Sequence, residues 1–138
     1  MKKEDISYNQ QILATIIYKD DIGHGIHFYT PDSNSLQVGC HYHAQGEIIR
    51  PHKHIPVKII RNEPLQEVLY IESGKLEISF YTENDGLLTT RVLGTGDIVL
   101  IQKGGHGFKF LEETKMVEIK QGPFILESKK PLEVKESS

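Results

Sequence analysis

Short apolar runs, separated by turns rich in glycine and proline, dominate the hydrophobic pattern of this 138-residue chain. The runs contain many β-branched and aromatic residues, which favour strands over helices. No long segment has the 3.6-residue periodicity of an amphipathic helix. Turn residues recur roughly every ten residues, a spacing typical of all-β sandwiches and barrels. Strands are predicted at residues 12–19, 26–30, 36–44, 97–102 and 115–121.

A hairpin is predicted in the middle of the chain. The runs over residues 67–82 and 87–93 flank the tetrapeptide Glu-Asn-Asp-Gly, whose last two residues are a strong turn signal. At the start of the first run, Glu67, Leu69 and Ile71 share one face because side chains alternate along a strand. We expect this face to point to the interior, which would place a carboxylate at one end of an apolar row.

A further strand is predicted at residues 46–54, with the sequence GEIIRPHKH. In a strand, His52 and His54 would point to one face and Lys53 to the other. Two neighbouring imidazoles fill a core poorly, but they are a good start for a metal site. The pattern therefore raises the question of whether the chain supplies further ligands.

Composition limits the possible functions. The length suits one domain with a proper core, and a net charge of −3 provides no broad basic field. Nucleic acid and anionic membranes are therefore not expected partners. The single cysteine, Cys40, cannot form an internal disulfide and suits a reducing compartment. With no apolar signal region and no membrane-spanning stretch in the sequence, we expect a cytoplasmic protein.

The first of two spaced motifs extends the histidine pair. Gly46 is followed after five residues by His52 and, one residue later, by His54. Further along, Glu67 is followed after six residues by Gly74.

The second motif supplies one more histidine. Gly96 is followed after five residues by Gln102, and Gly104 and His106 follow at alternate positions. Together the two motifs resemble the two-part signature of the cupin superfamily. The resemblance covers residues 36–122 and implies an all-β, double-stranded β-helix (jelly-roll) barrel. Residues 1–35 would add N-terminal strands that pack on the barrel, and residues 123–138 would form a partly frayed extension.

The resemblance also implies a ligand set. His52, His54, Glu67 and His106 would bind one divalent metal inside the barrel. The sequence departs from the family pattern in both motifs. In the first, twelve residues separate His54 from Glu67. In the second, Gln102 stands where the family has proline, and the motif is one residue short before His106. Imidazoles and a carboxylate suit Zn, Mn, Fe, Co or Ni and leave coordination positions open. The alternative is a barrel without metal, in which the histidines pack or act as acid/base groups.

Other histidines and polar residues have simpler interpretations. His41 and His43 share a face and could form a second ligand pair, but without an evident carboxylate partner we expect them at the surface or at a pocket rim. His24 and His27 are expected at the surface. We expect Cys40 to be a small core residue.

The insertion over residues 55–66, IPVKIIRNEPLQ, is a candidate for ligand recognition. Lys58 and Arg61, with Arg50 before the histidine pair, could hold a carboxylate or phosphate near the metal. Alternatively the insertion packs against a second subunit, because it also contains four Ile and Val residues. We expect a homodimer, with Phe124 near the interface. Tyr42 is a candidate for the wall of the cavity, although aromatic residues in a barrel are usually core residues.

Three functions remain open. The resemblance extends to small single-domain cupins encoded near polysaccharide or sugar-nucleotide genes. It implies a metal-dependent isomerase or epimerase that acts on a sugar, a sugar nucleotide or a related carbonyl or carboxylate compound. An iron-dependent dioxygenase is the first alternative, and it would be favoured if His52, His54 and Glu67 alone formed a three-ligand site. A non-catalytic domain that binds a small ligand is the second.

Overall fold

The computed structural model describes residues 3–123 and 130–133. Most of the expected C-terminal extension, including Phe124, lies outside these residues. The described chain consists of ten strands and one short 3-10 turn (η1, Lys19–Asp21). The strands are β1 (Lys3–Tyr8), β2 (Gln11–Ile17), β3 (Gly25–Phe28), β4 (Gly39–Tyr42), β5 (Glu67–Ser73), β6 (Lys75–Tyr81), β7 (Leu87–Gly94), β8 (Ile98–Ile101), β9 (Gly105–Phe110) and β10 (Lys115–Lys120).

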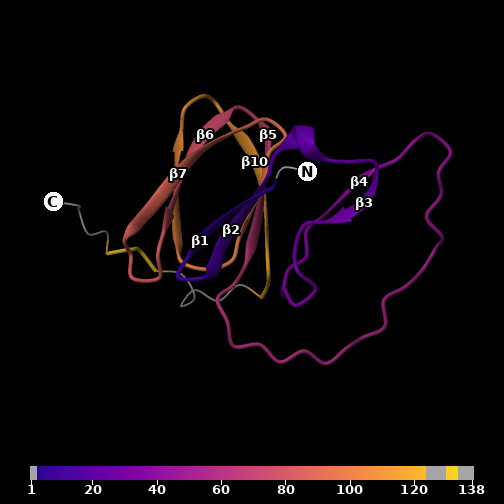
Figure 1. The fold of residues 1–138 in the computed structure, drawn as a ribbon, viewed down its shortest axis with the longest axis horizontal. Helices are drawn as coiled ribbons and strands as arrows, with labels where there is room; N and C mark the ends of the chain where they lie inside the picture. The colour runs from indigo at the N-terminus through magenta and orange to yellow at the C-terminus, as the bar shows by residue number, and fades with distance from the viewer. Residues whose placement is uncertain (1–2, 124–129, 134–138) are drawn as a thin grey trace.

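The strands form three antiparallel sheets, so the all-β prediction is confirmed. The main sheet has the order β1-β2-β8-β5-β10, and a smaller sheet has the order β7-β6-β9. The remaining two strands pair as the β3–β4 arm, which lies to one side of the rest in Figure 1. No helix in the described part of the chain is long and apolar enough to cross a membrane.

A hydrophobic core fills the space between the main sheet and the smaller sheet. Alternate residues of β2, β5 and β8 meet alternate residues of β6 and β7. Every second side chain of a strand points to the same face, so a sheet that packs on a core through one face buries every second residue there. The fully buried contributors include Ile16, Leu69, Ile71, Leu76, Ile78, Phe80 and Leu93.

The β3–β4 arm and its flanking residues cover the other face of the main sheet. Tyr29, Val38 and Cys40 pack against Ile17 and Leu100, which point away from the first core. The thiol of Cys40 is buried there, and burial raises its pKa. Cys40 is thus a core residue, as its sequence context predicts. The central strands of the main sheet are buried on both faces, which explains their continuous apolar character.

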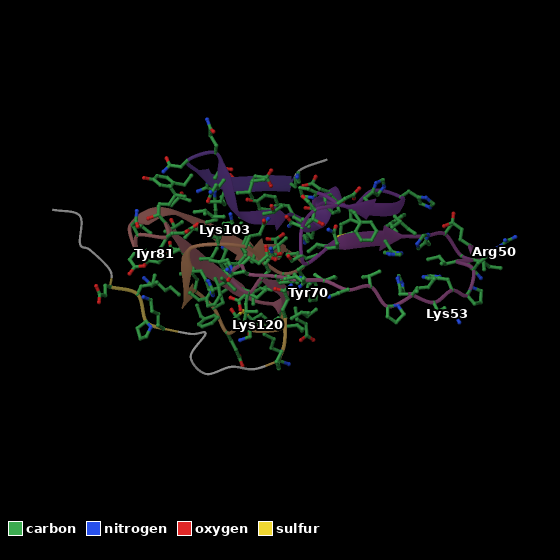
Figure 2. The ribbon with its side chains drawn as sticks, turned by 90° about the horizontal axis from the view of Figure 1, so that it is seen from below. Arg50, Lys53, Tyr70, Tyr81, Lys103 and Lys120 are labelled. Atoms are coloured by element: carbon green, nitrogen blue, oxygen red, sulfur yellow. The ribbon has the colours of Figure 1, made fainter. Side chains whose placement is uncertain are left out.

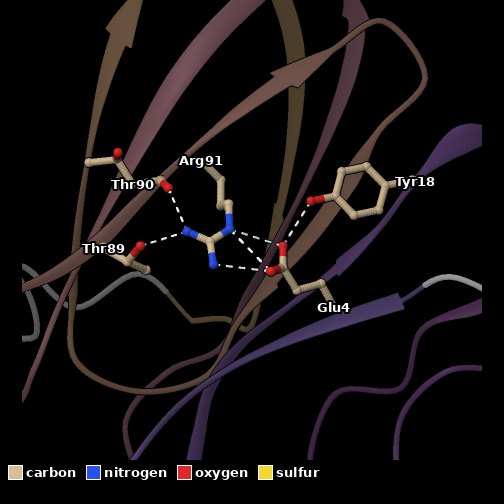
Figure 3. A network of polar contacts seen from close by, with 5 residues as sticks. All are labelled: Glu4, Tyr18, Thr89, Thr90 and Arg91. Atoms are coloured by element: carbon tan, nitrogen blue, oxygen red, sulfur yellow. Dashed lines mark hydrogen bonds and ion pairs between the residues drawn. The ribbon is translucent and has the colours of Figure 1, made fainter.

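An ion pair joins the edges of the two sheets (Figure 3). Glu4 on β1 accepts hydrogen bonds from Nε and Nη2 of Arg91 on β7, at 3.1–3.2 Å. The Tyr18 hydroxyl also donates a hydrogen bond to Glu4, at 2.9 Å. Nη1 of Arg91 donates to Thr89 Oγ1 and to the Thr90 carbonyl. The guanidinium therefore connects two strands that share no backbone hydrogen bonds.

Several strand predictions need correction. Residues 46–54 form no strand, and the chain runs without regular structure from residue 43 to residue 66 (Figure 1). Pro51 lies inside the predicted strand and Pro56 follows it, and a proline cannot donate to a ladder. The run over residues 67–82 is two strands separated at Gly74, whose φ of 104° breaks the extended path. The sequence did not predict β1 or β9.

The Arg91–Glu4 contact should make a measurable contribution to stability. Arg91→Met removes the guanidinium that donates hydrogen bonds to Glu4. It should lower the free energy of unfolding by about 1 kcal/mol at pH 7. The effect is modest because both side chains are partly exposed. Urea unfolding measures the difference. Lys109→Met, which removes an exposed cation on β9, is the matched control and should change little.

The same contact should make stability depend on pH. The hydrogen bond from Arg91 holds the pKa of the Glu4 carboxyl below its ordinary value of 4.5, although burial opposes this shift. A lowered pKa means that the stabilisation is complete above pH 4.5 and is lost as the pH falls through the lowered value. The stability gap between the wild type and Arg91→Met should therefore close in strong acid. An equal gap at pH 7 and in strong acid would contradict this role.

Candidate functional site

Glu67 and His106 meet at one end of the core. Glu67 begins β5 and lies on the same face as Leu69 and Ile71, which are buried in the core. His106 lies on β9 opposite Phe80 of β6, so its ring also points inward. Oε1 of Glu67 is 2.6 Å from Nε2 of His106. The two residues come from different sheets, so only the packing of the sheets brings them together.

The pair retains unused polar atoms. The Glu67 side chain is 10% exposed and that of His106 is 28% exposed. Despite the short contact, Oε1 of Glu67 has no hydrogen bond of acceptable geometry among the described residues. Nδ1 of His106 is also buried without a partner among them. Buried polar atoms are rarely left in this state, so each calls for a functional explanation.

Glu118 on β10 adds a second carboxyl group to this end of the core. Its neighbour across the ladder is Leu69, so it lies beside Glu67 on the same face. The close approach of the His106 imidazole holds the pKa of Glu67 below its ordinary value, against the effect of burial. The close approach of the Glu67 carboxyl, together with burial, raises the pKa of Glu118. Two adjacent carboxyls disfavour each other's ionised form, so the titrations of Glu67 and Glu118 are linked.

One signal for Glu118 in the sequence was overlooked. In β10, Met116, Glu118 and Lys120 alternate on the face that points to the site. Glu118 shares the face of Leu69, as Glu67 does, although Glu118 itself is exposed on the edge strand. It was overlooked because the opposite face of β10, with Val117 and Ile119, is the more apolar one.

Phe108 forms the aromatic side of the site. Its ring centroid lies 5.5 Å from that of His106, and it packs against the core beside Phe80. Phe108 is thus both a core residue and a neighbour of the candidate site.

His52 and His54 lie elsewhere, on the exposed segment of residues 43–66, hereafter the long loop. Their ring centroids are 5.3 Å apart, and Nδ1 of His52 is 2.9 Å from the carbonyl oxygen of Arg50. The structure therefore brings the predicted ligands together as two separate pairs. Among the described residues, no group of three or more His, Cys, Asp or Glu side chains is arranged to hold a metal ion.

The predicted ligand-binding cations are also on the long loop. Arg50, Lys58 and Arg61 are exposed. Figure 2 shows Arg50 and Lys53 at the far end of the loop, well away from Lys120 on β10, which lies opposite Glu67 in the ladder. Tyr42, on β4, is exposed and packs edge-to-face on His24 at 5.2 Å. In the described residues, no hydrogen bond or ion pair links any of these four predicted residues to Glu67 or His106.

A second histidine cluster lies where the long loop begins. Nδ1 of His41 is 3.1 Å from Nε2 of His43, and Nδ1 of His43 is 3.0 Å from Oε2 of Glu47. His24 approaches the other oxygen of Glu47 at 3.8 Å. The hydrogen bond from His43 lowers the pKa of Glu47. Glu47, four residues after His43, is thus the carboxylate partner that the sequence pattern did not reveal.

This cluster is a chain of contacts and not a ligand set. Both ring nitrogens of His43 are used, one by His41 and one by Glu47. The cluster therefore links the end of the β3–β4 arm to the start of the loop.

A polar hollow in the described part of the chain is separate from the Glu67–His106 pair. It has a volume of about 380 Å³ and is lined by polar groups that include Asn34, Gln66 and Gln102. Gln66 precedes Glu67 in the chain, but neither Glu67 nor His106 lines this hollow. The hollow therefore adds no residue to the site.

Comparisons with protein-family models, with curated proteins and with solved structures find no match to this chain. The function must therefore be argued from the chain's own residues and their geometry.

The turn before β9 should be essential for placing His106. Gly104 has a φ of 74°, and a Cβ at this position would overlap the carbonyl oxygen of Tyr81. Gly104→Ala should therefore lower the free energy of unfolding by about 2 kcal/mol, measured by urea denaturation. Gly107→Ala is the control on the same strand, because a Cβ there meets nothing within 4 Å. Equal stabilities of the two variants would show that the turn does not constrain β9.

Proposed function

We propose that this protein is a small jelly-roll cupin that binds one divalent transition metal and acts on a small molecule. The observation that carries the proposal is the Glu67–His106 pair. A carboxylate oxygen and an imidazole nitrogen, 2.6 Å apart, converge at the end of a core without a proper hydrogen bond between them. An oxygen and a nitrogen donor from two different sheets suit a cation better than they suit the apolar interior around them.

The donor set fits a borderline first-row cation. Glu67 and His106 would supply one oxygen and one nitrogen, and His52 and His54 would supply two more nitrogens from the long loop. Twelve residues separate His54 from Glu67, and a chain of that length spans up to about 40 Å when extended. Such a four-ligand set suits Zn, Mn, Fe, Co or Ni and leaves room for a substrate atom. Nδ1 of His106 remains available for an outer partner that would fix its tautomer.

A bound metal would polarise a carbonyl or diol oxygen of the substrate. Residues of this chain would do the rest. Glu118, on the same face beside Glu67, would offer a carboxyl group to exchange a proton with a ligand held there. Phe108 would shield one side from water. Arg50, Lys58 and Arg61 would hold an acidic substituent of the substrate once the loop reaches the site.

These roles suit isomerisation or epimerisation of a sugar, a sugar nucleotide or a related carbonyl or carboxylate compound. We expect the protein to work in the cytoplasm, where Cys40 stays reduced. The identity of the metal in the purified protein distinguishes this function from its alternatives. Iron together with consumption of O₂ would favour a dioxygenase. Zn, Mn or Ni without turnover of any candidate substrate would favour a binding domain.

Metal content tests the proposal. Untagged wild-type protein should hold one divalent metal per chain by elemental analysis. Glu67→Gln and His106→Ala should each lower Zn²⁺ affinity by more than about 100-fold, the upper cost of losing an outer-shell partner. Circular dichroism should show that both variants keep their strands.

The matched control is the double variant His41→Ala/His43→Ala, which alters the cluster on the arm and should leave Zn²⁺ binding unchanged. Wild-type affinity should weaken below about pH 6, because imidazoles must be neutral to bind a metal. Loss of metal only in the His41/His43 variant would assign the site to the other cluster. A wild-type protein that binds no metal would refute the proposed function.

A further inference from the structure

The long loop exposes an unusual amount of apolar surface. Ile48 and Ile60 are each 85% exposed, Ile55 is 79% exposed and Val57 is 73% exposed. Ile49 and Ile59 are also exposed. Single exposed apolar residues are normal, but six along one segment mark a surface that contacts a partner. A long segment without secondary structure in a compact domain also commonly has a binding role.

Contacts at both ends hold the loop away from its own core. At its start, Glu47 contacts His43 and His24, which fixes residues 43–47 at the β3–β4 arm. At its end, the Gln66 side chain accepts a hydrogen bond from the Leu36 amide, and the Gln66 backbone amide donates one to Gln121. Between these anchors, in the described chain, the only side-chain hydrogen bond of residues 48–65 is the one from His52 to Arg50. The middle of the loop therefore extends outward, as Figures 1 and 2 show.

The proposed metal site is divided by this arrangement. His52 and His54 are at the outer part of the loop, and Glu67 and His106 are at the end of the core. Each pair is preassembled, with its two side chains already next to each other. Neither pair provides the four ligands of the proposed site.

We propose that a second copy of this chain completes the site: the long loop of each copy places His52 and His54 against Glu67 and His106 of the other. This inference rests on the proposed metal site. The dimer would have two-fold symmetry, so that both loops make the same contact and two identical sites form. Each site would then contain two ligands from one chain and two from its partner.

The apolar area of the loop is about half of what a stable dimer needs. An aliphatic side chain offers roughly 100 Å² of apolar surface, so the six residues, at their exposed fractions, supply about 430 Å² per chain. A standard interface buries about 800 Å² per partner. Phe28 and Tyr42, exposed on the arm from which the loop starts, can supply most of the difference.

A receiving surface lies on the two strands next to the site. Tyr70 and Val117 are paired across β5 and β10, and both are exposed on the outer face of the main sheet, as is Ile119. This face is opposite to the one that carries Glu67, so a segment bound there must pass the edge of β10 to reach Glu67. β10 is also an edge strand whose outer backbone groups have no strand partner among the described residues. Such an edge is a ready site for an extended segment of another chain.

Charge favours the same contact. Residues 43–66 have a formal charge of +2, because they contain four cationic side chains (Arg50, Lys53, Lys58 and Arg61) and two anionic ones (Glu47 and Glu63). The whole chain has a formal net charge of −3, so the rest of the chain, without residues 43–66, has a charge of −5. A cationic loop is thus attracted to the acidic body of a second copy, where Glu67 and Glu118 lie close together.

Complementation between two defective variants tests this arrangement. One variant has His52→Ala/His54→Ala and the other has Glu67→Gln/His106→Ala. Each alone should lack a complete site and hold little Zn²⁺ after equilibrium dialysis with Zn²⁺ as the only added metal. The two are then co-expressed with different affinity tags and purified through both tags. The mixed dimer should hold about one Zn²⁺ per dimer, because one of its two sites receives four intact ligands.

The outcomes separate the two proposals. If the wild type holds one Zn²⁺ per chain and the mixed dimer holds none, the four ligands come from one chain and the shared site is wrong. A wild type that is a monomer by sedimentation and still binds Zn²⁺ would overturn the shared site in the same way. A wild type that binds no Zn²⁺ overturns the metal site itself and the inference with it.

A second pair of variants links dimerisation to metal content without changing any ligand. Ile59→Asn/Ile60→Asn should convert the dimer to a monomer and lower Zn²⁺ occupancy by about tenfold. Lys58→Arg/Arg61→Lys alters the same stretch but keeps its charge and its apolar residues, so it should stay dimeric with full occupancy. A monomeric Ile59/Ile60 variant with unchanged Zn²⁺ content would contradict the shared site.

Discussion

Strand alternation in β5 is the constraint on which the candidate site depends. Leu69 and Ile71 face the core between the two sheets, where both side chains are almost fully buried. The same alternation forces the Glu67 side chain into the end of the core. On the opposing sheet, pairing with Phe80 fixes His106 in the same way. The packing that stabilises the fold thus also holds a carboxylate against an imidazole, and neither can turn away without losing its strand register.

The parts of the fold that could be predicted from the sequence are the short apolar runs bounded by turn residues. The runs that became β2, β5, β6 and β8 are rich in apolar residues, and strand alternation predicted the interior face of β5 through Leu69 and Ile71. The strand β9 was missed because Gly105 and Gly107 interrupt its pattern. β1 was missed because it is mostly polar, and it is held in place partly by the Glu4–Arg91 pair, which joins residues far apart in the sequence.

The candidate site was partly predictable for the same reason. Glu67 was identifiable because it breaks an apolar row at an interior position, but its contact with His106 depends on how two sheets pack. The alternation along β10 places Glu118 on one face of that strand, but only the pairing of β10 with β5 brings it beside Glu67. The strand expected at His52 and His54 was wrong, because two prolines and the anchors at Glu47 and Gln66 favour an open loop. In our account, that loop is a surface that binds a partner, since isoleucines exposed to water contribute no hydrophobic stabilisation until they are buried.

The central claim is that Glu67 and His106 hold a metal together. Two-dimensional NMR of the ¹⁵N-labelled imidazoles during addition of Zn²⁺ observes this directly, because a coordinated ring nitrogen changes its chemical shift while the free one changes much less. The account predicts that the Nε2 signal of His106 moves in proportion to Zn²⁺ and stops moving at one equivalent per chain. The signals of His41 and His43 should stay in place. A His106 signal that does not respond, with His41 and His43 moving instead, would contradict the account.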